Sequence, residues 1–273
     1  MKLKSKVLLS LLATSSAAFA QTAPAPAAAP AAPETTIAYN VGVVSQYRYR
    51  GLAQTRGYPA LQGGVDYSNA NGIYLGAWAS TIRWIADAST TTKAVDGKVE
   101  LDLYGGYKFE AAGVAYDVGY LRYQYNGNTL AYLTSTYASN PLTNANTSEY
   151  YGAATVGAYT FKYSKSLTNL FGYQNSTGSA YYDLTANYDL GAGFNLSPHV
   201  GHQTVKGTSS SYYPGGASYT DYSLTLAKDL GNGISTTIAA VATNAKKNSN
   251  FLSNSSSYNV ARDAIVVGVK YTF

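Results

Sequence analysis

Charged residues recur at alternating positions within segments that are otherwise apolar, and they have the clearest chemical potential in this chain. The residues that we predict to line a pore on this pattern are Arg48, Arg50, Lys98, Glu100, Asp102, Asp183, Asp221 and Arg262. Opposed charges inside a channel set a transverse field and bias ion selectivity. The same charges could instead pair with one another and brace the wall. The sequence is compatible with both interpretations.

Catalytic chemistry has weaker support. The chain contains two histidines, and His202 falls in phase with an apolar face, where a Ser–His pair could hydrolyse lipids. No nucleophile-elbow sequence accompanies it, and Glu100 and Asp102 share one strand face without further catalytic context. The sequence also lacks a metal-ligand cluster, a phosphate loop and a dinucleotide fingerprint. We therefore predict no enzyme activity, no cofactor and no metal site.

Strands must position these side chains, and the C-terminal segment shows the pattern most clearly. Ile265, Val267, Val269, Tyr271 and Phe273 alternate with mostly small or polar residues. A period of two predicts a strand with one apolar face, and about ten residues is the length of a tilted strand that crosses a bilayer. A terminal aromatic with another two residues earlier is similar to the end signature of outer-membrane barrels. Tyr271 and Phe273 are therefore the predicted assembly signal.

Alternating segments of this kind recur along the chain, and about 12 can be traced. In the clearest, Val99, Leu101 and Leu103 oppose Glu100 and Asp102. Connections alternate between short turns and longer stretches rich in Ser, Thr, Asn and Gly, which is typical of a barrel with periplasmic turns and extracellular loops. An open edge in lipid would leave backbone groups without partners. The predicted fold class is all-β: a closed antiparallel transmembrane β-barrel.

Three local features can be compared with a structure. The first strand is expected to run from about Thr36 to Arg50, which would place Arg48 and Arg50 on the barrel wall. Pro198 removes a ladder donor from the ninth strand, so a bulge or local break is expected there. The longest connection, residues 126–147, could fold inward and narrow the lumen.

Glycines are unusually frequent on the expected inner face. They are Gly42, Gly64, Gly76, Gly106, Gly119, Gly201 and Gly268. Missing side chains leave space for water, and a barrel of about 12 strands lies between filled and wide-channel barrels. We therefore expect a narrow pore. The alternatives are that these glycines relieve wall curvature or make room for Tyr74, Trp78 and Tyr104 to pack inward.

The N-terminal segment has the features of an exported chain. Residues 1–20 are expected to be a signal peptide, with Lys2, Lys4 and Lys6 before a short apolar run and Ala18-Phe19-Ala20 as the cleavage site. Residues 21–34 form an Ala/Pro-rich linker, and residues 35–273 the barrel. Removal of the three lysines lowers the formal net charge from +5 to +2, which gives no case for nucleic acid. There is no cysteine, so no disulfide can staple the fold.

Several segments together resemble the TorF-type porin family of bacterial outer-membrane proteins. They are Ser45–Gly51, Gln54-Thr55, Pro59–Tyr67, Gly72–Ser80, Glu100–Tyr107, Tyr116–Gly119 and His199–Gly201. The resemblance covers nearly all of the chain after the leader and is strongest from Ser45 to Tyr125. Ala53 departs from the serine expected there. The resemblance implies an outer-membrane barrel of porin type.

We therefore expect a porin in the bacterial outer membrane that lets ions or small polar solutes diffuse passively through a narrow charged lumen. Its expected partners are outer-membrane lipids, the barrel-assembly machinery and the solutes themselves. One alternative is a structural or adhesin-like barrel, whose Ser- and Asn-rich loops at 204–218 and 245–258 would form the binding surface. The other is a lipid-modifying barrel enzyme that uses His202.

Overall fold

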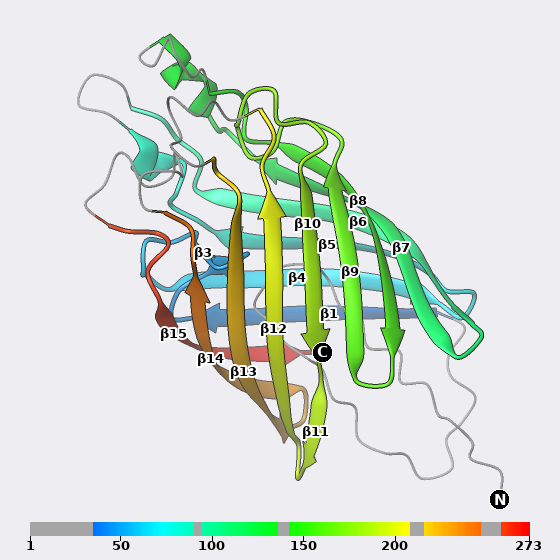
Figure 1. The fold of residues 1–273 in the computed structure, drawn as a ribbon. Coiled ribbons are helices and arrows are strands. Elements are labelled where there is room, and N and C mark those ends of the chain that lie inside the picture. The colour runs from blue at the N-terminus through cyan, green and yellow to red at the C-terminus, as the bar shows by residue number, and fades with distance from the viewer. Residues whose placement is uncertain (1–34, 90–93, 136–141, 208–215, 247–257) are drawn as a thin grey trace, which may run out of the picture.

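A computed structural model describes residues 35–89, 94–135, 142–207, 216–246 and 258–273 (Figure 1). The expected signal peptide and linker lie outside the described residues. None of the helices in these ranges is long and apolar enough to cross a membrane.

The described residues are almost entirely strands. The main sheet contains β1 (Thr35–Val44), β4 (Ala60–Asn69), β5 (Ile73–Thr81), β6 (Val99–Ala111), β7 (Val114–Tyr125), β8 (Thr147–Val156), β9 (Tyr159–Ser166), β10 (Ala180–Ala186), β11 (Tyr188–Gly191), β12 (Phe194–Thr204), β13 (Tyr219–Gly231), β14 (Ile234–Thr243) and β15 (Ala264–Thr272). A separate two-stranded sheet contains β2 (Arg48–Tyr49) and β3 (Leu52–Ala53). Two short 3-10 helices, η1 (Ala86–Ala88) and η2 (Leu130–Ser135), lie in the loops.

The main sheet closes on itself. All pairings are antiparallel: β1 pairs with β4 and β15, β12 pairs with both β10 and β11, and the other wall strands pair with the wall strands before and after them in the chain. Because β10 and β11 are successive parts of one wall strand along β12, the described residues form a ring of twelve strands (Figure 1). At the β1–β15 seam, Tyr39 and Phe273 exchange both backbone hydrogen bonds, each 2.9 Å from N to O. The predicted closed antiparallel barrel is confirmed.

The two faces of the wall differ as the alternation predicts. Ile37, Leu75 and Val267 point outward with 58%, 58% and 49% of their surface exposed, whereas inward residues such as Glu100 and Asp102 are buried. Aromatic rings gather on the outer face near the short turns, where Tyr39 stacks on Phe273 with centroids 5.8 Å apart. An apolar outer band with aromatic residues at its border is the surface of a transmembrane barrel.

Turn chemistry explains the short connections. Between β6 and β7, Ala112 and Gly113 both have positive φ (53° and 77°), and Asn232 and Gly233 repeat this between β13 and β14 (52° and 78°). Two consecutive residues with positive φ form the tight hairpin turn that matches strand twist. The long loops lie at the opposite end of the barrel (Figure 1). The predicted alternation of short and long connections is therefore confirmed in the described residues.

The bulge or break expected at Pro198 is absent from its own strand, and the interruption lies in the neighbouring strand instead. β12 itself is continuous, and Pro198 pairs in register with Leu224 of β13. On the other side, pairing to β10 ends at Thr185–His199 and resumes with β11 at Tyr188–Leu196. Pro198 cannot donate a ladder hydrogen bond toward this side, so the wall strand divides into β10 and β11 opposite it.

The first predicted strand is too long. β1 ends at Val44, and the chain then folds into the barrel, where residues 45–59 form what we call the inner segment. Arg50 and Gly51 have φ of 45° and 78°, which reverses the chain between β2 and β3. The placement of Arg48 and Arg50 on the wall was therefore wrong, because their alternating pattern continues through a bend that only the turn residues indicate.

Candidate functional site: a constriction in the lumen

The inner segment fills the lumen toward the end that carries the long loops. Tyr47, Arg48, Tyr49 and Arg50 are all buried, although none belongs to the wall. Tyr47 and Tyr49 share one hydrophobic cluster with Leu130, Leu142 and Ala145 of the connection between β7 and β8. The described part of the longest loop thus packs inward, as expected, and helps to close this end of the barrel.

Arg50 fastens the inner segment to the wall. Its Nη1 and Nη2 donate to Oε1 and Oε2 of Glu149 on β8 at 3.1 and 2.7 Å, and both side chains are buried. Nη1 also donates to Oε1 of Gln203 at 2.6 Å. The guanidinium carbon lies 4.3 Å from the ring centroid of Tyr181. A bidentate pair with a stacked aromatic fixes both position and orientation of the arginine.

Arg48 holds the inner segment to the loop that precedes β15. Its Nη1 donates to the carbonyls of Gly51, Val260 and Arg262 at 3.1, 3.2 and 2.8 Å. Its Nε donates to Gln46 Oε1 at 3.0 Å. The side chain of Arg48 therefore links the β2–β3 turn to the loop that precedes β15. Arg48 therefore holds the inner segment to a loop, whereas Arg50 holds it to the wall, so the two arginines are not interchangeable.

The acidic side of the constriction lies on β6. Tyr47 Oη donates to Glu100 Oε1 at 2.8 Å, and Asp102 follows on the same inner face. Tyr49 and Tyr123 share a hydroxyl–hydroxyl hydrogen bond of 2.6 Å, and Tyr123 Oη donates to Glu149 Oε2 at 3.3 Å. Tyrosine hydroxyls therefore join the inner segment to the acidic wall.

A second charged cluster lies across the lumen, on β10, β12 and β13. His199 Nε2 is 3.0 Å from Asp183 Oδ2, and Tyr181 Oη donates to the carboxylate of Asp221 at 3.1 Å to Oδ2. Thr185 Oγ1 donates to Asp183 at 2.8 Å. The sequence prediction of inward-facing Asp183 and Asp221 agrees with this placement.

The remaining predicted pore residues lie at the rim. Lys98 precedes β6, and 76% of its side chain is exposed, with Nζ 3.9 Å from Asp96 Oδ1. The guanidinium of Arg262 lies 5.2 Å from the ring centroid of Tyr258. The structure thus brings Arg50 and Asp221 near the same tyrosine, Tyr181, and leaves Lys98 and Arg262 at the mouth.

The inner glycines accommodate tyrosines. A Cβ at Gly76 would lie 2.3 Å from the ring of Tyr104, and one at Gly201 would lie 1.9 Å from Tyr181 Oη. A Cβ at Gly119 would likewise clash with the side chain of Tyr151. At these positions the expectation that the glycines leave space for water was wrong. Neighbouring aromatic rings occupy that space, so the alternative of inward packing holds.

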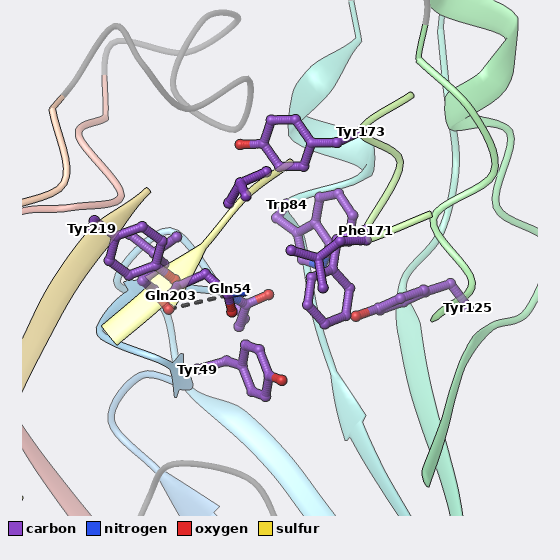
Figure 2. A pocket seen from close by; sticks show the side chains of 11 residues that line it. Tyr49, Gln54, Trp84, Tyr125, Phe171, Tyr173, Gln203 and Tyr219 are labelled. Carbon is purple, nitrogen blue, oxygen red and sulfur yellow. Dashed lines mark hydrogen bonds between the residues drawn. The ribbon is translucent and has the colours of Figure 1, made fainter. Parts of the chain in front are cut away.

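Little open space remains at the constriction. A cavity of about 40 Å³ lies between the inner segment, the loops and the wall, and Figure 2 shows the side chains that line it. Tyr49 and Gln54 face it from the inner segment, Trp84 and Phe171 from loops, and Tyr219 from β13. This volume is enough for a few waters, since one water needs about 10–15 Å³ of such space. This cavity therefore has room for water and is too small for a larger solute.

A cluster of polar side chains lies on the short-turn side of the inner segment. Tyr74 Oη donates to Asp117 Oδ1 at 2.6 Å and is also hydrogen-bonded to Tyr151 Oη. Lys162 Nζ lies 3.9 Å above the centroid of the Tyr151 ring. Charges of both signs, Asp117 and Lys162, thus continue along the wall beyond the constriction.

Sequence reasoning missed three residues of the constriction. Glu149, Gln203 and Tyr181 all contact Arg50, yet none was among the predicted pore residues. Each has the inward phase of its strand, which was the available signal. Their shared partner is on a segment that sequence analysis placed on the wall, so the contact itself could not be anticipated.

The outward histidine has a hydroxyl neighbour that the sequence did not indicate. His202 Nδ1 is 2.9 Å from Thr220 Oγ1 on the exposed face of β12 and β13. Among the residues that the structure describes, no carboxylate or amide hydrogen-bonds to its other ring nitrogen. A general base needs such a third group to orient it. The geometry therefore supports a polar surface pair in preference to a catalytic one.

Comparison with known proteins identifies the family. A family model described as "Bacterial protein of unknown function (Gcw_chp)" matches residues 27–273, so the chain belongs to this family. No curated protein matches the chain. The TorF-type assignment itself stays a prediction.

Three solved structures to which the chain is similar are outer-membrane proteins. The chain is similar to a NanC porin at 10% identity with a TM-score of 0.50, over 86% of this chain and 99% of the other. It is also similar to a KdgM porin at 9% identity with a TM-score of 0.48, over 88% and 99%. A COG4313 outer membrane channel from Pseudomonas putida F1 aligns at 12% identity with a TM-score of 0.43, over 92% and 99%. The NanC similarity supports an outer-membrane barrel fold.

Proposed function

We propose that this member of the Gcw_chp family is an outer-membrane channel for passive diffusion of ions or small polar solutes. The described conformation is its closed state, in which the inner segment blocks the lumen at the extracellular end. Opening requires the inner segment to leave its contacts with the wall.

The observation that carries this proposal is the contrast between the two faces of the wall. The outer face is an apolar belt, whereas the inner face carries Glu100, Glu149, Lys162, Asp183 and Asp221. Charged groups at membrane depth are costly and usually mark a solute path or a water-filled cavity. A barrel that served only as a support could be filled with apolar side chains.

The blocking contacts are of a kind that can reopen. In the described residues, Arg48 and Arg50 hold the inner segment to the rest of the barrel through hydrogen bonds and one ion pair, without a covalent cross-link. When these contacts break, water can hydrogen-bond to the exposed groups. This hydration offsets part of the free energy lost with the contacts. The segment is continuous with β1 and β4 at its ends, which keeps it available for reclosure.

Planar-bilayer recording tests the proposal. The refolded protein is placed in a bilayer with a salt gradient, and its barrel state is verified by heat-modifiable migration. We expect discrete conductance steps, and their reversal potential gives the ion preference. Silence from folded protein at all applied voltages would contradict the channel.

A further inference from the structure

One buried carboxylate of the lumen has no partner. Asp102 on β6 is 1% exposed, and neither of its carboxylate oxygens has a hydrogen-bond donor among the residues that the structure describes. A buried charge without a partner is strongly unfavourable, so such a group is paired, ligated or neutralised.

A second carboxylate shares its face. Glu100 stands two residues before Asp102 on the same strand and is also 1% exposed. Two rises of 3.3 Å place their Cβ atoms about 6.6 Å apart, so that the longer Glu side chain can reach toward a common point. Glu100 accepts a neutral hydrogen bond from Tyr47, which supplies no positive charge.

No basic side chain compensates this pair. In the described chain, Glu100 and Asp102 form no ion pair with lysine or arginine, whereas the nearby acid Glu149 is paired with Arg50. The local excess is therefore two negative charges. Two carboxylates that are close together hold either a proton or a cation between them.

The surroundings restrict what the cation can be. Trp78 and Tyr123 are the cross-strand neighbours of Asp102, and Tyr47 packs edge-on against Trp78 with centroids 5.5 Å apart. These rings exclude bulky organic cations from a site whose side chains are almost fully buried. The donor atoms are carboxylate and tyrosine oxygens, which are the ligands that hard cations prefer.

We propose that Glu100 and Asp102 form an internal binding site for a small divalent cation, with calcium the best fit. A divalent ion matches the excess of two charges. Calcium accepts irregular oxygen coordination, whereas magnesium needs near-octahedral geometry and retains its waters. No three His, Cys, Asp or Glu side chains converge within the described ranges, so hydroxyls and water complete the coordination. This inference departs from the expectation of no metal site and does not depend on transport.

Calorimetry with calcium alone tests the site. The refolded barrel, in detergent free of lipopolysaccharide and stripped with chelator, is titrated with calcium chloride. We expect one calcium per chain for the wild type and at least tenfold weaker binding for Asp102→Asn and for Glu100→Gln. Asp183→Asn is the matched control, because its carboxylate already has His199 and Thr185 as partners. It should bind within twofold of wild type.

Thermal unfolding provides an independent readout. Calcium should raise the melting temperature of wild type and of Asp183→Asn but not of Asp102→Asn. Without calcium, Asp102→Asn should melt at or above wild type, because it removes an uncompensated charge. Absence of both binding heat and a thermal shift in wild type would overturn the proposal in favour of a shared proton. Unchanged calcium affinity in both Asp102→Asn and Glu100→Gln would overturn it as well. Neither result bears on conductance.

Discussion

Arg50 and Glu149 form a bidentate ion pair that joins the inner segment to wall strand β8, with N–O distances of 3.1 and 2.7 Å. The pair spans a sequence separation of 99 residues and is buried at both ends. Because Gln203 of β12 also accepts from Arg50, one guanidinium bridges two wall strands that are not neighbours in the sheet. These contacts hold the inner segment inside the lumen, where it forms the constriction.

The first prediction concerns the stability of that pair. Glu149→Gln leaves Arg50 buried with a neutral partner, and loss of one member of a buried ion pair costs about 3–5 kcal/mol. We expect Arg50→Gln to cost a similar amount and the double variant to cost clearly less than the sum of the two. Urea unfolding of the three variants, followed by tryptophan fluorescence, measures this coupling.

If the losses of stability in the two single variants simply add up in the double variant, the pairing of Arg50 with Glu149 is contradicted. Lys98→Gln is the control, because 76% of the Lys98 side chain is exposed. It should shift the urea midpoint very little, since surface charges contribute about 0–1 kcal/mol.

The second prediction concerns the fit of inner glycines to tyrosines. Gly76→Ala places a Cβ within 2.3 Å of the Tyr104 ring, and overpacking of this kind costs about 1–3 kcal/mol. Tyr104→Leu in the same chain should restore part of the loss by removing the ring. Gly152→Ala is the matched control, because its Cβ would meet nothing closer than 4.0 Å. Equal unfolding midpoints for the alanine variants at Gly76 and Gly152 would show that the ring does not limit this site.

The third prediction concerns barrel assembly. Deletion of Phe273 removes the residue that exchanges both backbone hydrogen bonds with Tyr39 at the closing seam. It also removes the ring that stacks on Tyr39 and Tyr271. We expect a large loss of heat-modifiable barrel in outer-membrane fractions, and Phe273→Tyr should retain most of it. Wild-type levels of folded barrel in the deletion variant would refute an assembly role for Phe273.

The wall could be predicted from sequence because each strand carries its own evidence. In β6 the alternation of Val99, Leu101 and Leu103 with Glu100 and Asp102 fixes which face is buried, independently of any other strand. A one-residue shift of register would expose every charge to lipid, so the pattern leaves little freedom.

The constriction could not be predicted in the same way. Tyr47 to Arg50 continue the alternation of β1, and the turn at Arg50 and Gly51 is a weak signal within a polar stretch. Once a segment leaves the wall, its partners are set by the closed barrel and lie far away in the sequence. The space beside each inward glycine could not be predicted either. Whether water or an aromatic ring fills it depends on the side chains of the neighbouring strand.

Single-channel recording of wild type beside Glu149→Gln tests the central claim most directly. Both proteins are verified as folded barrels and recorded in the same salt and at the same voltages. Our account predicts that wild type is closed for most of the record and that Glu149→Gln spends a several-fold larger fraction of time open, with discrete steps. An unchanged open fraction in the variant, or silence from both folded proteins, would contradict it.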